Sequence, residues 1–243
     1  MIGMMLYKSI ADSFETTFFR EERWKMFLQG IGVTMLITVL SAVLGTLLGF
    51  GAYMLCRGGS KAANRITKLT VWLVEGMPTV VLLMILYYIV FWSLDESGII
   101  VSVIAFTLVF GASVYDMLCM GVAAVAGGQL EAARALGYKD RDAFFRVVLP
   151  QALPHIIPVY LSEISNLLRA TAVVGCIAVQ DLTRIGDMIL GKTFEAFLPL
   201  IAVAAVYYML AAVLTAFVKR LTARCDWKSR DVHEILKGVD TRD

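Results

Sequence analysis

Charged residues are scarce in this chain. Asp, Glu, Lys and Arg make up 17% of its 243 residues, against about 25% in an average soluble protein. Hydrophobic residues make up 59%, where about 45–50% is usual. A single soluble core does not grow large enough to bury that much apolar surface. The composition therefore excludes a soluble enzyme, a disordered regulator and a secreted disulfide domain, and it indicates a protein that crosses a membrane several times.

Metal-ligand clusters, paired cysteines and basic patches are also lacking. The four cysteines stand far apart, in or beside apolar stretches, and His155 and His233 have no companion motif. Cysteines without ligand spacing or a disulfide framework suit a reducing or lipid-buried setting. The net charge of +2 gives nucleic acid no polybasic surface. We therefore expect no metal, no cofactor bound by this chain and no nucleic acid partner.

Long uncharged runs predict the membrane spans. A transmembrane helix needs about 20 mostly apolar residues. Four clear runs meet this length: 26–56, 76–94, 97–115 and 196–218. A fifth region, 156–180, is apolar but contains Glu163 and Arg169, so hydropathy alone does not decide whether it crosses the membrane.

Basic residues decide the fifth span and the orientation. Segments 56–69, 119–155 and 218–230 are rich in Lys and Arg, which favours the cytoplasmic side, while the turn at 93–98 carries only acidic residues. Two cytoplasmic segments cannot be joined by a single crossing, so region 156–180 must also span. The sequence thus predicts an all-α, polytopic membrane helix bundle of about five transmembrane helices. Its N-terminus would lie outside, its C-terminus inside, and a loop with a coupling helix would lie in the cytoplasm.

Three segments make up the predicted organisation. Residues 1–25 are expected to be an amphipathic, interfacial segment, residues 26–221 the transmembrane domain, and residues 222–243 a cytoplasmic tail. We expect no cleavable signal peptide, because the start of the chain is too polar for one. Gly45 and Gly49 in the first span form a pair of small residues that permits close approach of another helix.

One motif is a false lead. Residues 186–193 read Gly-Asp-Met-Ile-Leu-Gly-Lys-Thr and match the pattern of a phosphate-binding loop. That loop needs a strand before it, a helix after it and an acidic residue to hold magnesium. Here it joins two spans on the predicted outer side. We expect a turn with glycine hinges that leads into the last span.

The cytoplasmic stretch 129–158 is too long and too structured to be a simple connection. The run from Glu131 to Gly137 reads Glu-Ala-Ala-Arg-Ala-Leu-Gly and favours a short helix that ends at glycine. Asp140 is placed to cap a second helix, 141–148, which Leu149-Pro150 should end. The alanines give the first helix a small-sided surface for a partner, and Glu131 suits the positive end of the helix dipole.

This stretch resembles the EAA loop of the permease subunits of ABC importers. The family pattern is Glu-Ala-Ala, three residues, Gly, nine residues, Ile, one residue, Leu-Pro, and only Val147 departs from it. The matching residues are Glu131, Ala132, Ala133, Gly137, Leu149 and Pro150. Gly128-Gln129 before the motif and Gln151-Ala152 after it further resemble the polar amino acid permeases.

The resemblance implies a transmembrane subunit of an ATP-driven importer that has no catalytic activity of its own. ATP and magnesium would be bound by a separate pair of cytoplasmic ATPase subunits. The six matching residues would couple ATP hydrolysis on those subunits to movement of the permease. The other implied partners are a second permease, identical or different, an extracytoplasmic solute-binding protein and membrane lipid. The implied location is the bacterial cytoplasmic (inner) membrane, and the implied solute is an amino acid or a derivative.

Ionisable residues inside the spans are candidates for the solute pathway, because charge in a bilayer usually faces the bundle interior or water. Arg169 is placed to meet a carboxylate, and Glu163 or Asp116 an amine. Thr171 is a further candidate, since Arg169-Ala-Thr-Ala stands where the subfamily often has Lys-Asp-Thr-Ser. Alternatively, Glu163 and Arg169 form an interface ion pair, while Glu75 and Asp116 lie at headgroup level. Departures from the subfamily leave the solute open.

Two other functions also remain open. One is a secondary transporter or channel that uses ion gradients through Asp116, Glu163 and Arg169, although five spans without an inverted repeat argue against it. The other is a membrane scaffold that recruits a cytosolic protein through residues 129–150 and transports nothing. Partnership with an ATPase whose turnover is stimulated by solute separates the importer from both.

Overall fold

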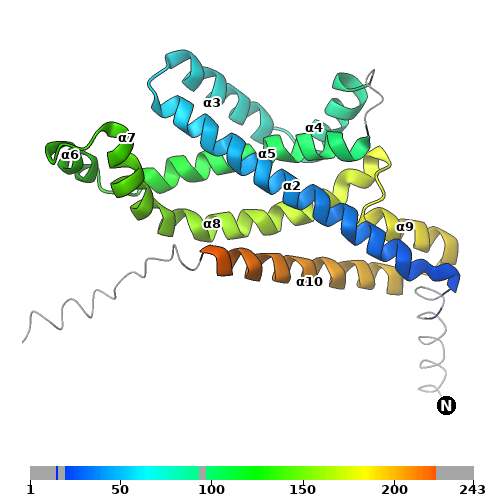
Figure 1. Cartoon of the computed structure of the whole chain (residues 1–243). Helices are drawn as coiled ribbons and strands as arrows, with labels where there is room; N and C mark the ends of the chain where they lie inside the picture. Colours follow the sequence, from blue (N-terminus) through cyan, green and yellow to red (C-terminus); the bar gives the residue numbers. More distant parts are fainter. Residues whose placement is uncertain (1–14, 16–19, 93–96, 223–243) are drawn as a thin grey trace, which may run out of the picture. The chain divides into compact units, whose positions relative to one another are not determined.

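The computed structural model describes residue 15, residues 20–92 and residues 97–222. The described part consists of helices and short connections and contains no strand (Figure 1), which confirms the all-α prediction for it. Most of the predicted interfacial segment 1–25, the acidic turn with Asp95 and Glu96, and the tail from residue 223 lie outside the described residues.

Four of the described helices are long and apolar enough to cross a membrane. A fifth crossing is added if α3 (Lys61–Glu75) and the following helical segment, Thr79–Val90, count as one bent span. The prediction of about five spans is therefore confirmed, and region 156–180 is part of one of them. The orientation across the membrane stays a prediction. The four long helices are α2 (Arg23–Arg57), α5 (Gly98–Ala123), the continuous series Asp140–Ile177, and α10 (Phe197–Thr222).

The second predicted span, 76–94, is not one straight helix. Its helical part is α4 (Thr79–Ile85) followed by the π-helical turn η3 (Leu86–Val90), and this segment lies at 108° to α3. Pro78 accounts for the break, because proline lacks an N–H and disfavours helical backbone at the residue before it. Segment 56–69, predicted only as a connection, contains the start of α3, where the Ser60 hydroxyl accepts a hydrogen bond from the Ala63 N–H at 3.3 Å.

The third long series joins α7 (Asp140–Ala143), the π turn η4 (Phe144–Val148), α8 (Leu149–Ala170) and the 3₁₀ turn η5 (Thr171–Ile177). The prediction that a helix ends at Leu149-Pro150 is wrong, because the helix continues through both residues. The π turn directly before them widens the helix, which accommodates a residue without an N–H. Two further prolines lie inside α8, as membrane helices tolerate.

The described residues fall into two compact units. The first takes in the chain up to Asp116 together with Ser162–Thr215, and the second takes in Met117–Leu161 and the chain from Ala216. Helices α2, α3, α4 and α9 (Leu182–Thr193) belong to the first unit. Helices α6 (Gly128–Ala135) and α7 belong to the second, while α5, α8 and α10 pass from one unit to the other.

Glycines bring α2 close to α5 in the first unit. A Cβ atom on Gly45 would lie 3.0 Å from the Phe110 side chain. A Cβ atom on Gly49 would overlap the Gly111 carbonyl oxygen and would lie 2.7 Å from Val114 Cβ. The predicted pair of small residues therefore lies at a helix–helix contact, where no side chain larger than hydrogen fits at Gly49.

Gly49→Ala should lower the free energy of unfolding by about 1–3 kcal/mol, because the added methyl overpacks the contact with α5. Gly51→Ala is the matched control: it lies on the same helix, and its Cβ would meet nothing within 4 Å. The control should be neutral or stabilising by up to about 1 kcal/mol, since alanine is the better helix former. Thermal unfolding in detergent, followed by circular dichroism, measures both. Equal stability of the two variants would contradict this packing.

Helix α9 contains the residues that match the phosphate-loop pattern. Because all of 186–193 is helical, the predicted turn with glycine hinges is wrong, and the helix leaves no loop of free N–H groups for a phosphate. A Cβ atom on Gly186 would lie 2.6 Å from Val203 Cγ2 of α10. The glycine thus allows α10 to pack closely on α9. The core at this place comprises Phe27, Leu182, Ile185, Ile189 and Val203.

Candidate functional site

The EAA motif forms α6 and the cap at its C-terminal end. Gly137 has a φ of +85°, a backbone conformation that favours glycine. Its N–H donates to the Arg134 carbonyl at 2.9 Å, and the Tyr138 N–H donates to the Ala133 carbonyl at 3.1 Å. These two bonds form a Schellman motif, which satisfies carbonyl groups at a helix end. The prediction that this helix ends at Gly137 is confirmed.

An ion pair joins the last turn of α6 to the start of α7. Arg134 Nε donates to Asp140 Oδ1 at 2.7 Å, and the two side chains are 52% and 70% exposed. The prediction that Asp140 caps the second helix is wrong: Lys139 is at the N-cap, and no side chain bonds there. An exposed ion pair contributes at most about 1 kcal/mol, so its effect is to orient the two short helices.

The alanines of the motif do not share one face. Ala133 is only 3% exposed, and α6 packs on η4, where Phe144 and Val148 are buried. Ala132 and Glu131 are exposed. The surface left for a partner is thus narrower than predicted, because Ala133 anchors α6 to its own chain.

The C-terminal end of the motif is tied to its beginning. Leu149 and Pro150 are half-buried at the start of α8. One turn further on, Gln151 donates through Nε2 to the Val147 carbonyl at 2.8 Å and to Gln129 Oε1 at 3.4 Å. The segment 129–150 is therefore a closed helix–turn–helix in the second unit, and we call it the EAA segment.

Acidic side chains from three helices approach one another in the first unit. The carboxyl groups of Glu75, at the end of α3, and Asp116 of α5 lie close enough to interact, and Glu163 of α8 acts on Glu75 electrostatically. Adjacent carboxylates repel one another, so a cationic group is favoured beside them. Glu75 is not one of the pathway candidates predicted from the sequence, and the sequence does not show that the bend at Gly76–Pro78 places it near Asp116.

A ladder of three polar side chains runs along α8. Arg169 Nη2 donates to Asn166 Oδ1 at 2.6 Å, and Asn166 Nδ2 donates to Glu163 Oε1 at 3.1 Å. Arg169 Nε also donates to the Ser165 carbonyl at 3.2 Å. The structure thus joins Glu163 and Arg169 through Asn166. Sequence reasoning missed Asn166, although its position three residues from each of the two was the available signal.

Thr171 is placed differently from these residues. It is fully buried, and its hydroxyl donates to the Leu168 carbonyl at 2.7 Å. The hydroxyl is therefore engaged within its own helical segment. A role for Thr171 in the solute pathway stays a prediction.

A buried carboxylate, Asp181, stabilises the start of α9. It accepts hydrogen bonds from the Arg184 N–H at 2.9 Å and the Thr183 N–H at 3.2 Å, and also from the Tyr207 hydroxyl at 3.2 Å. Burial raises the pKa of the Asp181 carboxyl above its ordinary value, while these hydrogen bonds act in the opposite direction. The neighbouring Leu182 N–H donates to Thr34 Oγ1 of α2 at 3.2 Å. Asp181 therefore joins the start of α9 to α10, and the Leu182 N–H joins the same place to α2.

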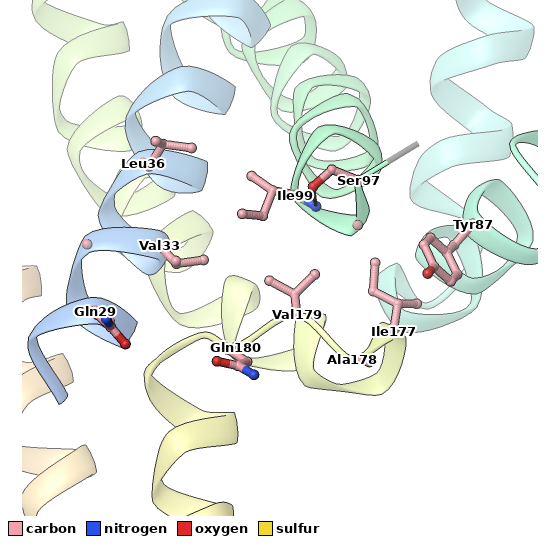
Figure 2. A pocket seen from close by; sticks show the side chains of 12 residues that line it. Gln29, Val33, Leu36, Tyr87, Ser97, Ile99, Ile177, Ala178, Val179 and Gln180 are labelled. Atoms are coloured by element: carbon pink, nitrogen blue, oxygen red, sulfur yellow. Dashed lines mark hydrogen bonds between the residues drawn. The ribbon is translucent and has the colours of Figure 1, made fainter. Parts of the chain in front are cut away.

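A cavity of about 670 Å³ lies in the first unit between α2, the start of α5 and the segment before Asp181 (Figure 2). The lining residues include no charged residue among those described; its polar side chains are Gln29, Tyr87, Ser97 and Gln180. Ala178 in its wall has a left-handed backbone, with a φ of 60°. The charged candidates for the solute pathway do not line this cavity.

Comparison with known proteins covers most of the chain. Residues 41–226 match the family described as "Binding-protein-dependent transport system inner membrane component". The chain is 30% identical over 209 residues to the arginine transport system permease protein ArtQ of Bacillus subtilis. The aligned region covers 84% of this chain and 93% of that relative. It is 26% identical over 227 residues to the histidine/lysine/arginine/ornithine transport system permease protein HisM of Salmonella typhimurium, covering 84% and 94%.

Solved structures agree with these relatives. The structure described as an amino acid ABC transporter with histidines superimposes with a TM-score of 0.74 at 27% identity, covering 82% of this chain and 94% of that one. The inward-facing MetNI methionine ABC transporter shares the fold, with a TM-score of 0.72 at 20% identity, covering 84% and 98%. The chain therefore belongs to the binding-protein-dependent transport system inner membrane components, the transmembrane permease subunits of ABC importers.

Proposed function

We propose that this permease takes up an amino acid or an amino-acid derivative, in a complex whose ATPase subunits are separate chains. Two such ATPases would close on ATP and magnesium and switch a pair of permeases between outward-facing and inward-facing states. The second permease is identical or different, and an extracytoplasmic binding protein delivers the solute. The complex would lie in the bacterial cytoplasmic membrane, in contact with its lipid.

The EAA segment carries this proposal. A helix that transmits a rigid-body movement must be fixed to its own chain and exposed to its partner. Helix α6 meets both needs, because it packs on η4 and its Ala133 is buried, while Glu131 and Ala132 are exposed. Its glycine cap and the Arg134–Asp140 pair hold it at a defined angle to α7. The segment needs no catalytic group of its own.

The polar side chains of the first unit support the class of solute. Arg169 offers a fork of N–H groups to a carboxylate. Glu163 and Asp116, with Glu75 near both, offer negative charge to an ammonium group. Charged groups on membrane-crossing helices face water or a protein partner. A solute with one carboxylate and at least one ammonium group fits this arrangement.

Reconstitution tests the proposal directly. The chain, purified with its ATPase, is placed in proteoliposomes with the binding protein outside, and uptake of radiolabelled arginine, glutamine and histidine is measured. We expect uptake that requires ATP on the ATPase side and persists when ionophores remove all ion gradients. Uptake that ignores ATP and stops with the ionophores would instead assign a gradient-driven transporter. Binding of the ATPase without uptake of any solute would assign a scaffold.

A further inference from the structure

Asn166 lies between two charged residues of α8, Glu163 and Arg169. Glu163 and Arg169 are six residues apart, which corresponds to about 9 Å along a helix axis. Each of the two is three residues from Asn166, which is close enough for side chains to meet. The bonds show that they do: the amide oxygen accepts from Arg169, and the amide nitrogen donates to Glu163. One neutral group thus satisfies two opposite charges.

A neutral bridge has a different effect from an ion pair. If the guanidinium and the carboxylate bonded to each other, each would cancel the other's charge and little would remain for a ligand. Asn166 orients both heads without cancelling either charge, because its amide has no net charge. Both groups therefore keep their charge for a third partner.

The remaining hydrogen-bonding capacity points the same way. Two of the five N–H donors of the Arg169 guanidinium are used, by Ser165 and Asn166. Within the described residues this leaves three for another acceptor, enough for a bidentate bond to a carboxylate. Asn166 and Arg169 are exposed on the surface of this single chain, although they lie in a helix that crosses the membrane. Such groups are expected to face a protein partner or a water-filled path.

We propose that Asn166 is a positioning residue for substrate recognition, which keeps Arg169 and Glu163 apart and charged so that they bind the carboxylate and the ammonium group of one zwitterionic solute. This inference rests on the proposed function, since it requires that the solute carries both groups. A solute lying across the amide of Asn166 meets the guanidinium with one end and the carboxylate with the other. The neutrality of residue 166 is then as important as its hydrogen bonds.

Two oppositely charged substitutions test this idea. Asn166→Asp gives Arg169 an anionic partner and should remove recognition of the solute carboxylate. Asn166→Lys gives Glu163 a cationic partner and should remove recognition of the solute ammonium group. Asn166→Gln keeps a neutral amide and should retain part of the recognition of both the carboxylate and the ammonium group. Asn64→Asp and Asn64→Lys are matched controls, because Asn64 on α3 is the only other asparagine of the chain.

Binding to the purified permease–ATPase complex in nanodiscs, without the binding protein, gives the readout. Dissociation constants are measured for arginine, glutamine or histidine, whichever binds, for its methyl ester and for its Nα-acetyl derivative. The wild type and the Asn64 variants should bind the parent at least about tenfold more tightly than either blocked compound. Asn166→Asp should lose the preference over the ester alone, and Asn166→Lys the preference over the acetyl compound alone.

Each other outcome has a separate meaning. If the wild type does not prefer the parent to the blocked compounds, the proposed solute class is wrong, whatever residue 166 does. If the wild type does prefer it and the Asp and Lys variants keep both preferences, or weaken all three ligands alike, the role of Asn166 is overturned while the importer stands. Should the charged variants fail to assemble, Asn166→Ser decides: the proposal requires that binding of the parent weakens more than binding of either blocked compound, and an equal loss for all three ligands overturns it.

Discussion

Gly137→Pro is expected to abolish ATP-driven uptake while the chain still inserts into the membrane. Gly137 has a φ of +85°, which proline, held near −65°, cannot adopt. Its N–H also donates to the Arg134 carbonyl, and proline has no N–H. The cap at the end of α6 would be lost, and with it the fixed angle between α6 and α7. ATP hydrolysis should then no longer respond to solute-loaded binding protein.

The loop offers its own control for this prediction. A Cβ atom would meet nothing within 4 Å at Gly137 or at Gly127, so the two positions differ in backbone and not in space. Gly127 has a φ of −56°, which any residue adopts. Gly137→Ala should cost about 1–2 kcal/mol locally and lower uptake moderately, while Gly127→Ala should change little. Uptake measured in proteoliposomes decides, and normal uptake by Gly137→Pro would remove the coupling assignment.

Arg169→Leu should weaken solute binding to the permease–ATPase complex roughly a hundredfold, corresponding to about 2.7 kcal/mol. The substitution removes the fork of donors proposed to hold the carboxylate, and it removes the N–H group that bonds the Asn166 amide oxygen at 2.6 Å. Arg169→Lys should be intermediate, because lysine keeps the charge but presents no planar fork.

The matched control for Arg169 is Arg65→Leu, which removes the same side chain from an exposed position on α3. It should bind solute like the wild type. Isothermal titration with the amino acid that the wild type binds gives the dissociation constants. Equal binding by the Arg169→Leu variant and the wild type would exclude Arg169 from the solute pathway.

Much of the fold could be predicted because the bilayer limits the possibilities. A helix that crosses it must be apolar and about 20 residues long, and the alternation of basic segments fixes how many crossings there must be. That argument recovered the fifth span, although Glu163 and Arg169 lower its hydropathy. The glycine cap of α6 could also be predicted, because a local run of residues determines it.

The errors arose where neighbouring residues outweigh local preference. Pro150 usually ends a helix, but a π turn before it lets the helix continue. Gly186 resembles a hinge, but it is a packing residue that faces Val203. Asp140 is a good capping residue in isolation, yet Arg134 binds it instead. The π turn and the contacts with Val203 and Arg134 cannot be read from the spacing of residues in the sequence alone.

The candidate site could be predicted only in part, because contacts between distant residues are not visible in the sequence. Charged residues in spans can be recognised from hydropathy, so Asp116, Glu163 and Arg169 were candidates at once. The contact between Glu75 and Asp116 depends on the bend between α3 and α4, whose size cannot be read from the letters. Asn166 is uncharged, so a search for ionisable residues passed over it.

Purification of the tagged chain in mild detergent, with mass spectrometry of the proteins that accompany it, tests the central claim most directly. The account predicts a stoichiometric nucleotide-binding subunit, and its loss when Glu131, exposed on α6, is replaced by arginine. A second, different permease in the same sample would identify a heterodimer. A chain that purifies alone or only with copies of itself, with no ATPase under any condition, would contradict the account.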